Sequence, residues 1–117
     1  MTEPYQLSVA QVASQIRDKQ LSPLTLMESL LARCEALEPR LQAWVTLDPQ
    51  GALAAAIDRE SELMREGPRG PLHGVPVGIK DIYNTQDMKT TCCSPIYADY
   101  VPDHDSTAVA MLKRAGA

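Results

Sequence analysis

The amine of Lys80 is the group in this sequence that is best placed to do chemistry. Lys80 lies near the end of the segment 71–81, which has the sequence PLHGVPVGIKD. The alternating apolar residues before it predict a short strand, and Pro76 and Gly78 share the lysine's face of that strand. Neither residue has a long apolar side chain that could cover the amine, so this face leaves room for a substrate.

Two interpretations of this lysine stay open from the residues alone. In the first, Lys80 marks the end of the strand and its amine reaches water, as lysine amines usually do. In the second, the amine is desolvated without a carboxylate partner, which lowers the pKa of a lysine and lets it act as a general base. Asp81 is adjacent, but neighbours in a strand point to opposite faces, so Asp81 is not automatically the counter-ion.

Other residue types that could do chemistry favour structural roles. His73 precedes the predicted strand, and we interpret it as a loop histidine that bonds to the backbone rather than as a base or a ligand. His104 lies between two aspartates, which is typical of a solvated acidic turn. Gly74, Gly78 and Lys80 do not form a phosphate-binding loop, which needs four residues between the glycines and a lysine directly after the second.

The chain has three cysteines, Cys34, Cys92 and Cys93. An odd count is a poor disulfide framework, and the adjacent pair lacks the spacing of redox and zinc motifs. We therefore expect three reduced thiols in a cytoplasmic protein, with no metal and no cofactor bound.

Composition narrows the class of protein. The 117 residues are enough for one domain with a modest core, and 44 % hydrophobic with 22 % charged residues is ordinary for a globular chain. The net charge of −4 offers no basic surface to nucleic acid. The sequence has no long apolar run and no apolar signal core at its start, so we expect neither a membrane span nor secretion.

Helices are predicted wherever a capping residue precedes a helical pattern of apolar residues. In two of these places a proline follows the cap, at the first helical position, where its missing N–H costs nothing. Pro39 is expected to limit the second helix, because the residue before a proline avoids the helical region. The caps that start the four predicted helices are Ser8, Ser22, Asp48 and either Asp105 or Ser106.

Two segments favour strands and give the predicted fold class. Residues 41–47 include Trp44 and Val45, which favour strands, and the lysine segment follows after one helix. Strand, helix and strand at this spacing predict a βαβ unit with parallel pairing and a right-handed crossover. The predicted fold is therefore α/β, with N-terminal helices before the βαβ unit. The polar stretch 84–105 remains a long loop, which is usually functional or flexible.

Several short motifs resemble one known family. The sequence GVPVGIKD at 74–81 resembles the lysine strand of the amidase signature family. The other motifs that fit the family pattern are PLH at 71–73, TTCCSP at 90–95 and LKRAGA at 112–117. The resemblance is loose over the N-terminal helices and close from about Pro71 onward. Cys93 departs from the pattern, since family members commonly have glycine there, and a glycine often serves a positive φ.

The resemblance implies an enzyme that hydrolyses or transfers amides through a Ser–cis-Ser–Lys triad. Lys80 would be the triad lysine, which accepts a proton from the bridging serine. The two serines have no counterpart in this chain, because the family's serines lie in a later glycine- and serine-rich stretch. We interpret Ser94 as a loop hydroxyl. The family fold is a mixed sheet covered by helices, and it needs a far longer chain.

We therefore predict that residues 1–117 are an N-terminal fragment of a single amidase signature domain, with a helical lead-in at 1–40 and the start of the α/β core at 41–117. The complete protein would be an amidase acting on a small-molecule amide, or the A-type subunit of a glutamyl-tRNA(Gln) amidotransferase, acting on glutamine and aminoacyl-tRNA. The chain alone should be inactive and should need the remainder of the domain; homo-oligomerisation is left open. The alternative is a standalone helical interaction module without catalysis.

Overall fold

The helices of the chain begin where its sequence supplies caps. The structure, a computed structural model, describes residues 2–117. Its α-helices are α1 (Val9–Arg17), α2 (Pro23–Leu41), α3 (Pro49–Glu66) and α4 (Thr107–Arg114), and two short 3-10 helices are η1 (Pro4–Gln6) and η2 (Pro95–Tyr97). Their caps Ser8, Ser22, Asp48 and Ser106 each accept a hydrogen bond from a backbone N–H of the first turn, so the first three caps are as predicted and Ser106 is the cap of α4 rather than Asp105.

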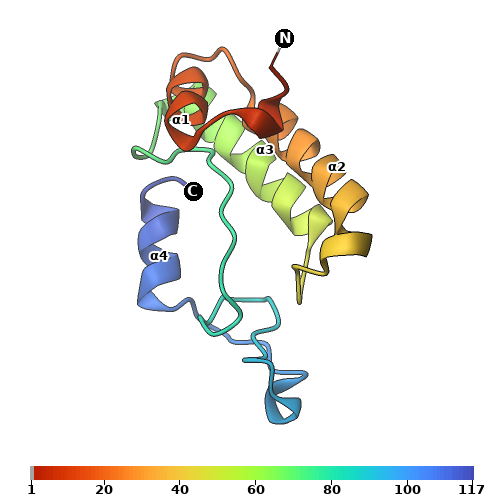
Figure 1. Cartoon of the computed structure of the whole chain (residues 1–117). Helices are drawn as coiled ribbons and strands as arrows, with labels where there is room; N and C mark the ends of the chain where they lie inside the picture. Colours follow the sequence, from red (N-terminus) through yellow and green to blue (C-terminus); the bar gives the residue numbers. More distant parts are fainter. Residues whose placement is uncertain (1) are drawn as a thin grey trace.

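The first three α-helices form a bundle with its own core. Helices α2 and α3 pack against each other in antiparallel directions, and α1 lies across one end of the pair (Figure 1). The core is made by apolar side chains from all three helices together with Val75. The buried members of this core are Val12, Ile16, Leu26, Leu63 and Val75.

The predicted α/β fold with a βαβ unit is wrong for this chain. Residues 2–117 contain no strand, and α3 packs on α2 instead of covering a sheet. Residues 75–80 are extended, yet the backbone N–H groups of residues 77–80 have no hydrogen-bond partner within the described residues. A strand exists only as part of a hydrogen-bonded ladder, so a single extended segment with no neighbour forms no sheet.

The other predicted strand, at residues 41–47, is replaced by a helix end. Helix α2 continues through Pro39 to Leu41, two residues beyond the expected limit. The carboxylate of Glu38 then accepts hydrogen bonds from the backbone N–H groups of Ala43 and Trp44. These N–H groups therefore bond within the turn. Trp44 and Val45 favour strands, but no neighbouring strand is present in the described residues for them to pair with.

The polar stretch between the lysine segment and α4 forms an ordered lobe without regular structure, which we call the lower lobe (residues 81–106; bottom of Figure 1). Backbone N–H groups of Asp87 and Thr90 donate to the carbonyls of Pro102 and Tyr100 at 3.1 and 3.0 Å. Thr90 and Pro102 are both buried. The lobe is thus held by cross-loop hydrogen bonds around a small interior.

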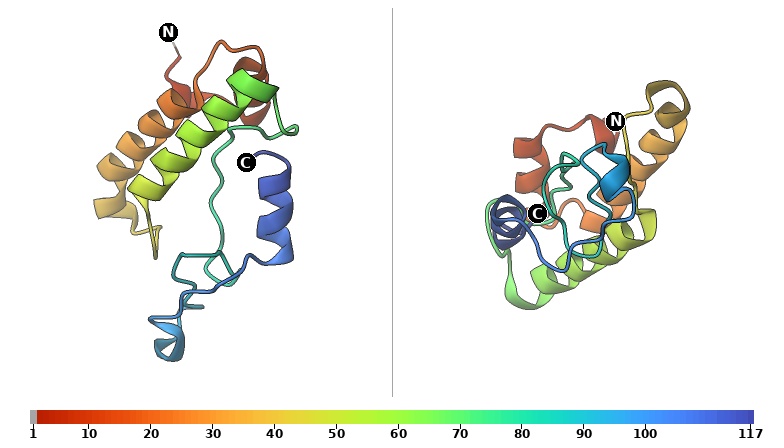
Figure 2. Two further views of the ribbon diagram at one scale, coloured as in Figure 1. Left: turned by 180° about the vertical axis from the view of Figure 1, so that it is seen from behind. Right: turned by 90° about the horizontal axis from the view of Figure 1, so that it is seen from below.

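Helix α4 runs back from the lower lobe beside the lysine segment, so that the C-terminus approaches the helical bundle (Figures 1 and 2). Two backbone hydrogen bonds close this return: Leu72 N–H donates to Ala115 O and Gly74 N–H donates to Gly116 O, both at 2.9 Å. None of the helices in residues 2–117 has the length and apolar character needed to cross a membrane.

Candidate active site around Lys80

Lys80 lies where the extended segment leaves the helical bundle and turns into the lower lobe. Val75, at the start of this segment, is buried in the bundle core, whereas Lys80 at its end is exposed. The Lys80 carbonyl accepts hydrogen bonds from the N–H groups of Ile82 and Tyr83 at 2.7 and 3.1 Å, so the chain turns directly after the lysine. The amine itself has no hydrogen bond or ion pair to any residue from 2 to 117.

The face beside the lysine is less bare than the sequence indicated. A Cβ atom added at Gly78 would come within 3.2 Å of the Trp44 indole ring. Trp44 therefore covers part of the face that Gly78 leaves open, while remaining 41 % exposed itself. No sequence pattern indicates this contact, because the two residues are far apart along the chain and the strand preference of Trp44 points to a different structure.

Asp81 is held by Thr91 across ten residues of the chain, an arrangement that we call the Asp81–Thr91 clamp. One carboxylate oxygen accepts the Thr91 N–H at 2.8 Å, and the other accepts the Thr91 hydroxyl. The Asp81 carbonyl also accepts the Cys92 N–H at 2.8 Å. The side-chain and backbone hydrogen bonds from Thr91 hold the pKa of Asp81 below its usual range. Asp81 is thus turned toward the lower lobe.

The clamp holds a turn with unusual backbone angles. Cys92 and Cys93 have φ values of 52° and 53°, in the left-handed region that glycine adopts most easily. Cys93 thus adopts the positive φ that a glycine often serves at such a position. Ser94 follows, and its hydroxyl accepts the Ile96 N–H at 3.3 Å to start η2, which agrees with its interpretation as a loop hydroxyl.

His73 is buried, and both of its ring nitrogens bond to the backbone. Nδ1 accepts the Arg69 N–H at 2.9 Å, so the ring is the neutral tautomer whose Nε2–H donates to the Arg59 carbonyl at 2.7 Å. The structural interpretation of this histidine is confirmed. His104 is exposed, and its hydrogen bond to Asp103 at 2.8 Å lowers the pKa of that carboxyl group.

Charged side chains brace the region where the lysine segment begins. The Glu62 carboxylate pairs with Arg69 at 2.8 Å and with Arg59 at 3.1 Å, and the hydrogen bond from Arg69 lowers the pKa of Glu62. The Arg59 Nε–H also donates to the Gly116 carbonyl at 3.1 Å. This network joins α3, the His73 loop and the end of α4. It therefore fixes both ends of the part of the chain, from His73 to α4, that carries Lys80.

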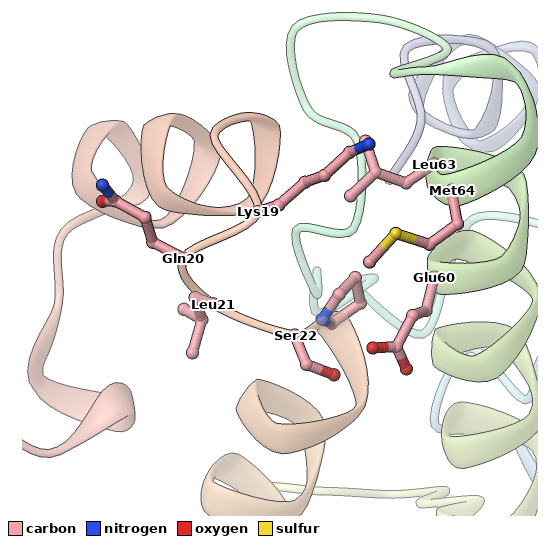
Figure 3. A pocket seen from close by; sticks show the side chains of 8 residues that line it. Lys19, Gln20, Leu21, Ser22, Glu60, Leu63 and Met64 are labelled. Carbon is pink, nitrogen blue, oxygen red and sulfur yellow. The ribbon is translucent and has the colours of Figure 1, made fainter.

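Two small pockets lie away from the lysine. One, of about 80 Å³, is formed between the α1–α2 connection and α3, with Lys19, Glu60 and Met64 around it (Figure 3). The other, of about 190 Å³, includes Arg17 and His73 in its wall. Neither is lined by Lys80.

The described residues contain no cluster suited to a metal ion and no disulfide. No three His, Cys, Asp or Glu side chains from residues 2–117 are placed so that they could hold a metal ion together. Cys34, Cys92 and Cys93 are unbridged, and only the adjacent pair is exposed.

Known proteins similar to this chain share the segment that carries Lys80. The model of the family described as Amidase matches residues 25–117. The A-type subunit of glutamyl-tRNA(Gln) amidotransferase from Roseiflexus castenholzii is 44 % identical over the whole of this chain and 24 % of its own length. The putative amidase AmiD of Mycobacterium bovis is 40 % identical over 95 % of this chain and 23 % of its own length.

A solved structure extends this likeness to the backbone. The peptide amidase of Stenotrophomonas maltophilia superposes with a TM-score of 0.88 at 34 % identity, over 98 % of this chain and 24 % of that protein. The chain therefore spans about a quarter of the length of the proteins it matches. The chain belongs to the amidase family.

Proposed function

We propose that this chain is the lysine-bearing N-terminal part of one amidase domain, and that Lys80 is the catalytic base of an enzyme that hydrolyses small-molecule amides. The observation that carries the proposal is the placement of an unpaired amine at the end of the extended segment, inside the region that matches the family. The names of the similar proteins, which include a putative amidase, a peptide amidase and a glutamyl-tRNA(Gln) amidotransferase, support amide chemistry.

The chemistry follows from a Ser–cis-Ser–Lys triad of which this chain supplies Lys80 alone. The neutral lysine accepts a proton from a bridging serine, and that serine activates a nucleophilic serine, which attacks the amide carbonyl and forms an acyl-enzyme. Both serines come from the remainder of the domain. Without them, the 117-residue chain is inactive, and release of ammonia from glutamine by an amidotransferase is the alternative use of the same triad.

Two features support further parts of this proposal. The three unbridged cysteines support a cytoplasmic location, where thiols stay reduced. The unpaired N–H groups of residues 77–80 support contact with the rest of the domain, since backbone donors without partners are costly when they are buried.

A standalone helical interaction module remains the second candidate, because one observation favours it. The bundle of α1, α2 and α3 has a self-contained core, and large apolar side chains such as Ile96, 87 % exposed, stand on the surface of the lower lobe. A module of this kind would need no lysine chemistry, so amide hydrolysis by the wild-type protein separates the two candidates.

The test is to replace Lys80 in the complete protein and assay a panel of small amides. Lys80→Ala should reduce kcat by about 10²–10⁴-fold, the usual effect of losing a general base. Lys80→Arg should be nearly as damaging, since guanidinium does not deprotonate at working pH. Lys89→Ala is the matched control, because Lys89 is an exposed lysine of the lower lobe whose ion-pair partner is Asp99.

Activity above about a tenth of wild type in either Lys80 variant would exceed what loss of a general base allows and would refute the catalytic role. The interaction module would be favoured if the wild-type protein hydrolysed none of the amides while circular dichroism showed that its helices were formed.

A further inference from the structure

The charges of Lys80 and Asp81 are adjacent in sequence, but their side chains do not pair. Other neighbours in this chain do: Arg65 pairs with Glu66 at 3.1 Å, and Arg17 approaches Asp18 at 3.8 Å. No carboxylate oxygen from residues 2–117 lies within 4.0 Å of the Lys80 amine. Adjacency therefore allows such a contact without requiring it, since Asp58 and Arg59 are also adjacent and form no ion pair.

The Asp81 carboxylate instead makes the contacts of the Asp81–Thr91 clamp. Both carboxylate oxygens of Asp81 accept hydrogen bonds from Thr91, one from its N–H at 2.8 Å and one from its hydroxyl. Both side chains are half-buried, which strengthens these bonds relative to a solvent-exposed ion pair. The carboxylate is thus fully engaged by neutral donors on the side of the lower lobe.

From this arrangement, and resting on the proposed role of Lys80, we propose that Thr91 is a positioning residue that keeps the Asp81 carboxylate away from the lysine amine. A carboxylate within about 4–6 Å favours the charged form of an amine, and a charged amine cannot accept a proton. By holding Asp81, Thr91 allows the base to be neutral although an acidic residue directly follows it.

Among the titratable groups near this turn, Asp81 is the carboxylate that has to be kept away from the Lys80 amine. The segments that contact Asp81 carry the titratable residues Tyr83, Cys92 and Cys93, none of which has a carboxylate side chain. Most acids of the lower lobe have partners of their own. These pairs are Asp99 with Lys89, Asp103 with His104, and Asp105 with Lys113; the remaining one, Asp87, is exposed.

The first test measures the pH dependence of kcat/KM in the complete protein. Thr91→Val removes the hydroxyl donor and frees one carboxylate oxygen, so the rising limb of the profile should move to higher pH by about one unit, the lower end of the effect of an opposite charge. Activity at neutral pH should fall about tenfold, mainly in kcat. Thr91→Ser keeps the hydroxyl and should restore the wild-type profile.

The decisive variant is Thr91→Val combined with Asp81→Asn. The amide is uncharged, so the profile should return to that of the wild type even without the clamp. If Thr91→Val lowers activity without moving the profile, or if Asp81→Asn fails to restore it, Thr91 is merely structural and the inference is overturned.

A second test needs no catalysis and uses the 117-residue chain. NMR titration of the Asp81 carboxyl carbon should show the same pKa with and without Lys80→Ala when Thr91 is present. In the Thr91→Val background, Lys80→Ala should raise the pKa of Asp81, because the two side chains now interact. Equal values in that background would overturn the inference, whereas an active Lys80→Ala enzyme would overturn only the proposed function.

Discussion

The helical bundle and the lower lobe pair their backbone N–H and C=O groups in different ways. In α1, α2 and α3, N–H groups beyond the first turn bond to carbonyls of their own helix, and a side-chain cap accepts from the first turn. In the lower lobe, donors and acceptors come from distant residues, as in Thr90 with Tyr100 or Thr91 with Asp81. Local bonding makes the bundle self-sufficient, whereas the lobe and the lysine segment depend on what packs around them.

This difference predicts that the bundle core dominates stability. Leu26→Ala removes a side chain that is 1 % exposed between α1 and α3, and it should lower the free energy of unfolding by about 2–5 kcal/mol. Urea denaturation of the 117-residue chain, followed by circular dichroism at helical wavelengths, measures it.

The control for this substitution is Ile57→Ala on α3, where the side chain is 48 % exposed and the change should stay within about 0.5 kcal/mol. Equal effects at the two positions would mean that the bundle has no specific core, and the contrast between the regions would fail.

A second substitution tests the junction between the two regions. Gly116 has a φ of 98°, and a Cβ there would lie 2.5 Å from the backbone of His73. Gly116→Ala should destabilise the chain by more than the backbone strain alone, which is about 1–3 kcal/mol, because the added Cβ also displaces α4. Thermal unfolding measures the effect.

Gly67→Ala is the matched control, since Gly67 also has a positive φ, 86°, but nothing lies within 4 Å of an added Cβ. It should show the backbone strain alone, about 1–3 kcal/mol, because its φ of 86° and ψ of −178° are adopted easily only by glycine. A Gly116 variant no worse than this control would show that contact with His73 does not hold α4.

Protonation of Asp81 at low pH should destabilise the lower lobe. Because its pKa is lowered in the folded chain, its carboxylate stabilises the lobe above the ordinary aspartate range, and that contribution disappears as the pH falls through the lowered value. Hydrogen exchange, corrected for intrinsic rates, should show protection at Thr91 and Cys92 falling with pH. Asp81→Asn should flatten this dependence, and parallel curves for the two proteins would contradict it.

The smallest expected effect lies at the strained turn. Cys93→Gly should stabilise the chain by up to about 1 kcal/mol, because glycine adopts the φ of 53° without a Cβ penalty. Cys93→Ala keeps the penalty and should leave stability nearly unchanged. Thermal unfolding of both variants separates a backbone effect from loss of the thiol, which would change both alike.

Sequence reasoning succeeded where structure is local and failed where it is not. Ser8, Ser22, Asp48 and Ser106 were recognisable caps, because a cap bonds to residues two or three positions away. The strands were wrong, because strand preference at Val45 or Val77 has meaning only when a partner strand is present.

In the candidate site, Lys80 was recognisable from its segment, and its catalytic role remains a prediction. The sequence left open whether Asp81 is the counter-ion of Lys80, and its partner Thr91 was not found. No spacing rule joins residues ten positions apart through a turn with positive φ values. The contact of Trp44 with Gly78 escaped for the same reason, since it depends on how the end of α2 meets the lysine segment.

Two hydrogen bonds join Leu72 to Ala115 and Gly74 to Gly116. They make the chain between these residues, which carries Lys80 and the lower lobe, a loop that is closed at its base. The entropy of closing a loop grows only slowly with its length, so the base and the tip are energetically separable. Insertions near Ile96, which is 87 % exposed at the far end, would therefore change the length of the lobe while leaving the bundle intact. Related chains could thus vary in this lobe while the lysine keeps its place.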